Sequence, residues 1–323
     1  MNNMRIVYMG TPEFAVESLR ALVEGGYEVA GVVTAPDKAV GKHQSTLQPS
    51  PVKLYARSVG LPVLQPVKLR DEAFLSQLAS LKADLQIVVA FRMLPEAVWN
   101  MPPQGTFNLH ASLLPQYRGA APINWAVING ETLTGVTTFF LTHEIDAGRI
   151  ILKESLPVPD DADAGSVHDA LMKIGASLVV RTVDLVISGQ AGAVASEQSV
   201  CDGNLLRPAP KIFTETCRID WNCDLKRVYD FIRGLSPYPA AWTTLALPGV
   251  QGGQTLKIYR SEKRFATHSL RPGTVLSDSK TYLDVVVPGG FLRLTSLQLA
   301  GKKRMDAASF LNGFKYVEGS AVE

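Results

Sequence analysis

Three side chains that could act together on a carbonyl group stand at alternate positions: Asn108, His110 and Ser112. The run from Thr106 to Leu109 is β-prone, and side chains two apart in an extended strand point to the same side. We therefore expect Asn108 and His110 to converge, with Ser112 close behind if the extension continues. A hydrogen-bond donor, a titratable base and a hydroxyl are what a site for a polarised carbonyl would use. A strand end whose histidine is merely capped by a neighbour is the alternative.

The imidazole of His110 needs a third group to orient it, and Asp146 is the leading candidate. Asp146 lies in the short connection 142–148, which ends in a glycine and can present a carboxylate. A carboxylate beside the imidazole would set its tautomer. Asn108 could then donate to a developing oxyanion, so the set predicts acyl transfer through a tetrahedral intermediate. Other carboxylates that could take this place are Glu144, Asp160, Asp161 and Asp163.

Other chemistries are possible for the same residues. His110, His143 and Asp146 could bind a metal, although no paired-histidine helix or Cys/His cluster supports this. Ser112 could be a nucleophile with His110 as its base, although the G-x-S-x-G elbow of such hydrolases is absent. The residues could also merely stabilise a loop.

The elements that must position these residues begin with a βαβ unit. Residues 5–9 form an apolar run, apolar residues then recur at helical spacing from 14 to 23, and 27–33 is the next β-prone run. Thr11 is expected to cap the helix and Pro12 to occupy its first position. The first turn lacks the G-x-G-x-x-G fingerprint, so we predict no NAD or FAD.

The rest of the first 190 residues completes a mixed sheet. The run 84–91 is apolar enough for a strand buried on both faces. Two β-prone runs, 135–141 and 149–154, are joined too closely for a crossover helix and should form an antiparallel hairpin. A long helix is expected over 166–187 with Ser166 as its N-cap, and 34–50 is expected to be a polar loop.

The C-terminal third has a different pattern. Residues 190–210 are polar and rich in Gly and Pro, which indicates a linker, and a helix is expected over 225–233. Several short β-prone runs with Gly/Pro turns then predict a small barrel. Residues 1–207 carry 16 Lys and Arg against 20 Asp and Glu, whereas residues 208–323 carry 16 against 10. The basic excess indicates a polyanionic partner.

Composition sets broader limits. A chain of 323 residues that is 46% apolar and 19% charged predicts a globular protein of two domains. The N-terminus has no signal-peptide pattern, and no apolar run approaches membrane-spanning length. Cys201, Cys217 and Cys223 form no C-x-x-C pair, which argues against a disulfide framework or a structural zinc. We expect a cytoplasmic enzyme without a membrane partner.

Residues 108–123 (NLHASLLPQYRGAAPI), with Ile145-Asp-Ala-Gly148, resemble the signature of the 10-formyltetrahydrofolate-dependent formyltransferases. Gly10-Thr-Pro-Glu-Phe14, Pro49-Ser-Pro-Val-Lys53, and Arg233-Gly-Leu-Ser-Pro-Tyr-Pro239 with Trp242 extend the likeness over nearly the whole chain. The long loop and the last of these segments are similar to the members of the family that act on a charged tRNA.

The resemblance implies an α/β fold: a Rossmann-like, mixed but mostly parallel sheet with flanking helices, plus a C-terminal OB-like β-barrel. It implies a catalytic domain over 1–189, a linker over 190–207 and a basic tRNA-binding domain over 208–323. It puts catalysis on Asn108, His110 and Asp146. It also implies that folate, as 10-formyltetrahydrofolate, is contacted by Ser112, Leu113, Leu114, Pro115, Phe91, Arg92, Met93 and Leu94.

The acceptor implied by the resemblance is the α-amino group of initiator methionyl-tRNA. The long loop would enter the acceptor stem, and the expected tRNA contacts are Lys38, Lys42, His43, Lys211, Arg233, Lys302, Lys303 and Arg304. The family usually has arginine where Lys42 stands and glycine where Arg92 stands, so phosphate contacts and the pterin pocket are expected to differ in detail.

The implied mechanism is direct attack of the neutral amine on the formyl carbon, without a metal. Asn108 and protonated His110 would stabilise the oxyanion, and Asp146 would hold His110. A formyltransferase for a nucleotide-linked amino sugar or a ribonucleotide amine is one alternative, and a catalytically inactive tRNA-binding module is another. We expect a monomer.

Overall fold

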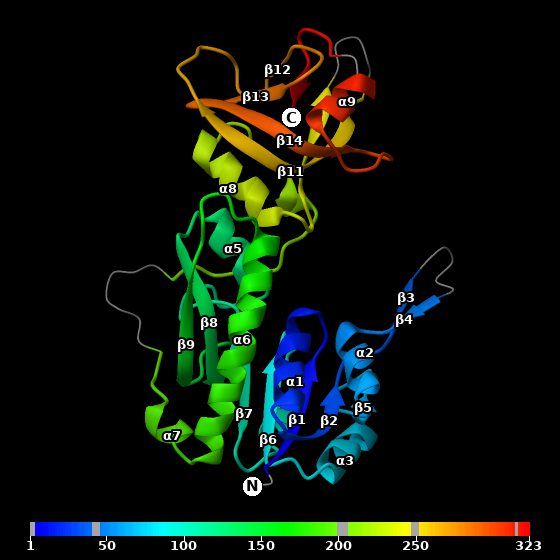
Figure 1. The fold of residues 1–323 in the computed structure, drawn as a ribbon, viewed down its shortest axis with the longest axis vertical. Coiled ribbons are helices and arrows are strands. Elements are labelled where there is room, and N and C mark those ends of the chain that lie inside the picture. The colour runs from blue at the N-terminus through cyan, green and yellow to red at the C-terminus, as the bar shows by residue number, and fades with distance from the viewer. Residues whose placement is uncertain (1–3, 41–45, 199–205, 247–251, 314–315) are drawn as a thin grey trace. The chain divides into compact units, whose positions relative to one another are not determined.

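The computed structural model describes residues 4–40, 46–198, 206–246, 252–313 and 316–323 (Figure 1). The chain divides into two compact units. The first comprises 1–119, 134–156 and 168–208, and the second comprises 120–133, 157–167 and 209–323. The second unit thus includes two segments from within the first 190 residues. The domain limits drawn from the sequence, with a linker at 190–207, stay a prediction.

The first unit is built on a seven-stranded sheet in the order β5-β2-β1-β6-β7-β8-β9. The pairs β1–β2, β1–β6, β2–β5 and β6–β7 are parallel, whereas β7–β8 is antiparallel. The predicted mixed, mostly parallel sheet is therefore confirmed. The strands are β1 (Arg5–Gly10), β2 (Glu28–Val33), β5 (Val63–Leu64), β6 (Leu85–Val89), β7 (Thr106–His110), β8 (Leu133–Phe140) and β9 (Ile150–Pro157).

Helices flank this sheet (Figure 1). They are α1 (Phe14–Glu24), α2 (Pro51–Ser58), α3 (Glu72–Ser80), α4 (Glu96–Trp99), α6 (Ala164–Ile187) and α7 (Ala191–Val194). Gly175 of α6 lies so close to Leu109 of β7 that an added Cβ would approach the leucine side chain to 2.8 Å. The strand β6 is buried along its whole length, as its apolar composition predicted.

Two predicted helix starts are wrong. Helix α1 begins at Phe14 rather than Pro12, because Pro12 and Glu13 form a turn before it and the N-cap Glu13 makes no side-chain cap. Helix α6 begins at Ala164, and the cap comes from Asp163, whose carboxylate accepts from the backbone N–H of Ser166 at 2.8 Å. An aspartate three residues before the expected N-cap satisfies the first turn as well as serine would.

The loop predicted over 34–50 contains a short hairpin, β3 (Lys38–Val40) with β4 (Thr46–Gln48). Its base is held by an ion pair between Lys53 Nζ and Asp37, 2.6 Å long, whose lysine side chain is almost fully buried. This lysine hydrogen bond holds the pKa of the Asp37 carboxyl below its usual value. Two predicted tRNA-contact residues, Lys42 and His43, lie outside the described residues.

The second unit contains an antiparallel sheet in the order β12-β13-β14-β11-β10-β16, with β15 paired to β14. Its two edges meet, because Thr274 bridges Ala321 and Val275 N–H donates to the Ser320 carbonyl, so the barrel is nearly closed as predicted. The strands are β10 (Ala241–Ala246), β11 (Gln254–Phe265), β12 (Val275–Ser277), β13 (Leu283–Val287), β14 (Gly290–Leu299), β15 (Met305–Asp306) and β16 (Ala321–Val322).

Helices of the second unit pack around this sheet. They are α5 (Pro122–Ile128), the 3₁₀ helix η2 (Glu215–Cys217), α8 (Leu225–Leu235) and α9 (Ala307–Gly313). Helix α8 lies against α5, where Gly234 allows a close approach: an added Cβ would meet the Ile128 side chain at 2.5 Å. The other face of α8 packs its apolar residues into the barrel core.

A buried carboxylate links the cations of α8. Asp230 is 3% exposed, and it accepts from Arg233 Nε at 2.7 Å and from Lys226 Nζ at 2.5 Å. Arg233 also donates to the Ala162 carbonyl at 2.8 Å, which ties the segment 157–167 to α8. Its guanidinium is therefore occupied inside the unit.

Substituting Asp230→Ala should lower the free energy of unfolding of the second unit by about 3–5 kcal/mol, because it leaves the buried guanidinium of Arg233 without its counter-ion. Lys226→Ala is the control, since that side chain is 57% exposed and its loss should cost under about 1 kcal/mol. Urea unfolding followed by tryptophan fluorescence would report both, because Trp221 lies in this core. Equal effects of the two substitutions would contradict this account.

Candidate active site

Asn108 and His110 lie on β7, between the parallel partner β6 and the antiparallel partner β8. Asn108 pairs in register with Val88 on one side and Phe139 on the other. His110 is 6% exposed and ends the strand. The alternation of the strand puts both side chains on the same side. Among the described residues, nothing hydrogen-bonds the side-chain amide of Asn108, so its donors are available to a ligand.

Both ring nitrogens of His110 have a partner. Nε2 lies 2.8 Å from the backbone carbonyl of Tyr117, and Nδ1 lies 3.8 Å from Oδ2 of Asp146. A carbonyl oxygen only accepts, so Nε2 carries a hydrogen and Nδ1 is the edge that faces the carboxylate. The structure thus brings Asp146 to His110 from a position 36 residues further along the chain.

Asp146 is held in a backbone conformation that few residues other than glycine adopt, with φ at +52°. Its Oδ2 accepts from the backbone N–H of Gly119 at 3.0 Å, and its side chain is 14% exposed. Gly148 ends the same connection, where an added Cβ would lie 1.7 Å from the Phe140 carbonyl oxygen. The carboxylate that faces His110 is therefore fixed by contacts on both sides.

The other carboxylates considered for this role have different surroundings. Asp160 accepts from Lys263 in the second unit at 2.5 Å, and this hydrogen bond holds the pKa of Asp160 below its usual value. Asp163 caps α6. Glu144 and Asp161 are exposed. Asp146 alone of the five candidates has a described contact with His110.

The segment from Ser112 to Pro115, predicted to contact folate, is a loop whose polar groups are bonded internally. Ser112 Oγ donates to the Gln116 carbonyl at 2.7 Å, so this hydroxyl is not directed at His110. Thr137 of β8 donates to the Ser112 carbonyl at 2.6 Å and accepts from Leu114 N–H at 3.2 Å. These contacts do not support Ser112 as a nucleophile with His110 as its base.

Lys153 of β9 also holds this loop, since its Nζ donates to the Leu114 carbonyl. Leu114 is almost fully buried and packs with Phe139 and Ile150. Burial lowers the pKa of Lys153 below its ordinary value. A threonine and a lysine on neighbouring strands therefore set the backbone of the loop.

The second predicted folate segment, Phe91 to Leu94, divides between core and surface. Leu94 belongs to a core cluster with Val7 and Met9, and Phe91 packs against it. Arg92 donates to the carbonyls of Pro66 and Val67, and burial lowers its pKa. Met93 is 72% exposed. The guanidinium of Arg92 thus ties this segment to the residues after β5, and the folate contacts of all four stay a prediction.

The predicted tRNA contacts differ in exposure. Lys38, Lys211, Lys302, Lys303 and Arg304 are exposed, as an anion-binding residue needs to be. Lys211 lies over Phe213, and Arg304 lies over Tyr259. Arg233 is 6% exposed and bonded to Asp230 and Ala162, so assigning it to the tRNA surface needs correction. The sequence did not reveal that its charge is neutralised within the fold.

The metal alternative gains no support from the geometry. His143 lies 3.6 Å from Glu96 and against Trp99, and 74% of its side chain is exposed. Within the parts of the chain that the structure describes, no three His, Cys, Asp or Glu side chains gather in a way that could hold a metal ion. No described helix is long and apolar enough to cross a membrane.

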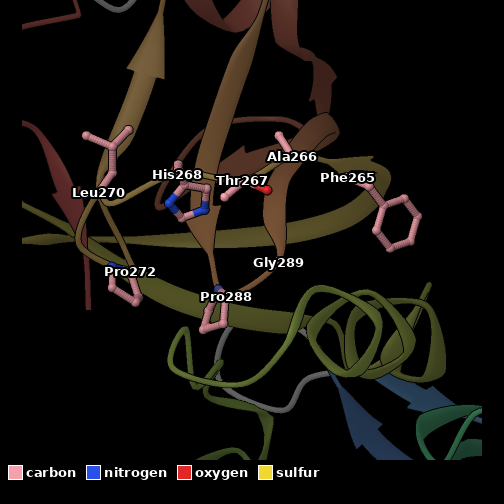
Figure 2. Close-up of a pocket in the computed structure, with 8 residues that line it drawn as sticks. All are labelled: Phe265, Ala266, Thr267, His268, Leu270, Pro272, Pro288 and Gly289. Atoms are coloured by element: carbon pink, nitrogen blue, oxygen red, sulfur yellow. The ribbon is translucent and has the colours of Figure 1, made fainter.

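A cavity of about 660 Å³ lies in the second unit, lined by Phe265, Ala266, Thr267, His268, Leu270, Pro272, Pro288 and Gly289 (Figure 2). His268 is its titratable side chain, and Nε2 of that ring is shared between the carbonyls of Val287 and Gly290. This cavity lacks the paired acid and base found beside β7. The candidate active site is therefore the His110 site.

Comparisons with known proteins identify the family of this chain. The family model for formyl transferase matches residues 4–183, and that for the formyl transferase C-terminal domain matches 211–315. The chain belongs to the formyl transferase family. A curated relative from Parabacteroides distasonis, named methionyl-tRNA formyltransferase, is 66% identical over 317 residues, which cover 98% of this chain and 97% of the relative.

Solved structures share the fold of this chain at low identity. HypX from Aquifex aeolicus in complex with tetrahydrofolic acid has a TM-score of 0.62 and 20% identity, covering 98% of this chain and 48% of HypX. This chain thus spans about half of HypX. The sugar 3N-formyl transferase WlaRD, determined with dTDP and 5-N-formyl-THF, has a TM-score of 0.63 and 18% identity, covering 93% of this chain and 99% of that one.

Sequence reasoning missed three members of this formyltransferase site. Tyr117, whose carbonyl contacts His110, lies inside the stretch 108–123 but acts through its backbone, so its side-chain type carried no signal. Thr137 and Lys153 were interpreted only as parts of a hairpin. A buried threonine and a lysine in β-prone runs beside apolar neighbours were the available signals.

The depressed pKa of Lys153 predicts a pH-dependent stability. The unfolded chain binds the proton more tightly than the folded protein, so the contribution of Lys153 to the free energy of unfolding rises as the pH increases from the lowered folded pKa toward the ordinary value of 10.5. Lys153→Met removes this titration. The free energy of unfolding of the wild type minus that of Lys153→Met should therefore become more positive toward pH 10.5. Urea unfolding of both proteins at several pH values would measure this difference. Parallel stability curves for the two proteins would contradict the prediction.

Proposed function

We propose that the protein transfers the formyl group of 10-formyltetrahydrofolate to the α-amino group of initiator methionyl-tRNA. The observation that carries the proposal is the extent of the likeness to the Parabacteroides relative, which spans both units at 66% identity. The catalytic role of Asn108, His110 and Asp146 is supported by their geometry. The imidazole and carboxylate lie 3.8 Å apart, and Asn108 is on the same strand.

The chemistry of these side chains fits attack of an amine on a formyl carbon. In this structure the Nε2–H of His110 donates to the Tyr117 carbonyl, and we propose that it exchanges this oxygen for that of the substrate. Together with the amide of Asn108, it would stabilise the oxyanion of the tetrahedral intermediate. Asp146 orients the other edge of the ring and, through water, would accept the proton that the attacking amine releases. His110 or solvent then protonates the N10 atom of the folate as it leaves.

The folate is proposed to lie beside the loop from Ser112 to Pro115. Thr137 and Lys153 occupy the polar groups of that loop, so its shape is set before a ligand binds. HypX and WlaRD, which share the fold, were determined with tetrahydrofolic acid and with 5-N-formyl-THF, and this supports a folate co-substrate. The predicted contacts from Phe91, Arg92, Met93 and Leu94 belong to the same proposal.

The tRNA is proposed to bind through exposed basic residues. Lys302, Lys303 and Arg304 follow one another after β14, and Lys211 is exposed near the start of the second unit's C-terminal part. Clustered cations on one segment suit a phosphate backbone. A cytoplasmic, monomeric enzyme remains our expectation for its location and assembly.

A formyltransferase acting on a sugar nucleotide or a ribonucleotide is the nearest alternative. WlaRD shares the fold, but at 18% identity that likeness concerns the fold alone. The curated relatives at 52–66% identity named methionyl-tRNA formyltransferase favour the tRNA acceptor. An inactive tRNA-binding module is disfavoured because the acid–base pair is assembled.

A panel of acceptors with 10-formyltetrahydrofolate would test the proposal. The wild type should formylate charged initiator tRNA, and should not formylate a nucleotide-linked amino sugar or a glycinamide ribonucleotide. His110→Ala and Asp146→Asn should each lower kcat on the tRNA by at least about 10²- to 10³-fold, because each removes a group that acts on the developing charge.

The matched control is His143→Ala, a histidine in the same hairpin connection as Asp146 whose side chain is largely exposed. It should keep near-normal turnover. Activity on a small amine without activity on tRNA would overturn the proposed acceptor. Turnover by Asp146→Asn equal to that of the wild type would overturn the catalytic assignment.

The surface cations make a separate prediction. The double variant Lys302→Ala and Lys303→Ala should weaken tRNA binding and reduce the slope of log K against log salt by about 1–2, because each phosphate contact contributes a slope near 0.7–0.9. Filter binding at several salt concentrations would measure this. Lys280→Ala, an exposed lysine at a turn of the same unit, provides the comparison. An unchanged slope would remove these two residues from the interface.

A further inference from the structure

Gln198 contacts both ends of the turn that presents the catalytic carboxylate. Its side-chain Nε2 donates to the Asp146 carbonyl at 2.8 Å and to the Gly148 carbonyl at 2.9 Å. A primary amide has two N–H donors, and here both are used on carbonyls two residues apart. Gln198 follows Ser196, which pairs with Ile150 at the start of β9. The segment predicted as a linker therefore packs along the active-site hairpin.

Arg118 bonds the oxygen of the Gln198 side-chain amide. Its Nε and Nη2 donate to Gln198 Oε1 at 3.1 and 2.6 Å, so the oxygen and nitrogen of the amide cannot exchange places without losing all four contacts. The next residue, Gly119, donates its N–H to the Asp146 carboxylate. Arg118 and Gly119 thus reach the same turn, one through Gln198 and one directly.

The conformation of Asp146 explains why such support is needed. A positive φ at a residue other than glycine costs free energy and persists only where the surroundings hold it. The carbonyl of Asp146 is bonded by Gln198, and its carboxylate is bonded by Gly119. These two contacts fix both the peptide and the side chain of the residue that faces Nδ1 of His110.

We propose that Gln198 is a positioning residue for formyl transfer, which acts by holding the Asp146 turn so that the carboxylate faces His110. The proposal rests on the function proposed above, because it assumes that Asp146 serves the reaction. Gln198 does not touch the reacting atoms in this account. Its effect passes through Asp146 alone.

The isosteric substitution Gln198→Glu separates positioning from packing. Glutamate keeps the shape and gains an ion pair with Arg118, but it has no N–H to donate and turns an oxygen toward two carbonyls. The global fold should be retained, with an unchanged melting temperature. The turn should lose its support, and kcat should fall on the order of 10- to 100-fold, as expected when a catalytic group is displaced.

The KM values for 10-formyltetrahydrofolate and for the tRNA should stay within about twofold of the wild type, since only a transition-state interaction is weakened. Glu197→Gln is the matched control, because it makes the reverse change one position earlier on a side chain that is 81% exposed. It should behave like the wild type.

A double-mutant cycle with Asp146→Asn tests whether Gln198 acts through the Asp146 carboxylate. The rate constant of formyl transfer is measured under single-turnover conditions. If Gln198 acts only through the Asp146 carboxylate, adding Gln198→Glu to Asp146→Asn should change kcat by less than about twofold. Additive losses, or full kcat in Gln198→Glu alone, would overturn the positioning role. Failure of the wild type to formylate the tRNA would instead overturn the proposed function. The double-mutant cycle is therefore measured with whichever acceptor the wild type formylates.

Discussion

The contact on which the first unit's candidate site depends is that between the Asp146 carboxylate and the buried imidazole of His110. Oδ2 of Asp146 lies 3.8 Å from Nδ1 of His110. This contact joins the end of a central strand to a turn between two later strands. The catalytic role proposed for this pair requires the turn to be rigid, because a small displacement of a catalytic group costs much of its effect. The backbone of Asp146 at φ +52° is accordingly bonded on both its carbonyl and its carboxylate.

The loop from Ser112 to Pro115 is also held by hydrogen bonds to its backbone. Thr137 bonds the Ser112 carbonyl and the Leu114 N–H, and Lys153 bonds the Leu114 carbonyl. Because buried polar groups need partners, these contacts define one conformation of the loop. The amide of Asn108, by contrast, has no side-chain hydrogen bond among the described residues. The Asn108 amide thus remains available to a ligand, whereas the Nε2–H of His110 and the groups that shape the loop are bonded within the protein.

The second unit meets a different requirement. Its barrel is nearly closed by bonds at the start of β12 and of β16, and α8 places the buried Asp230 between two cations. The basic residues after β14 stay exposed, while Arg233 is drawn inward. Charge on the sequence therefore divides into a part that stabilises the fold and a part that is available to a polyanion. Exposure and pairing distinguish the two, which a count of charges does not.

The sequence by itself determined the features that depend on local periodicity. The period of two in β7 put Asn108 and His110 on one side, and the short connection after β8 predicted that β8 and β9 are neighbours in the sheet. The tertiary structure decided which groups meet across long separations: Asp146 with His110, Gln198 with the Asp146 turn, and Arg233 with Asp230. It also decided the starts of α1 and α6, where the possible N-cap positions lie within three residues of each other. The physical reason is that hydrophobic spacing records which face of an element is buried, whereas a contact between distant segments depends on topology and on backbone groups that every residue shares.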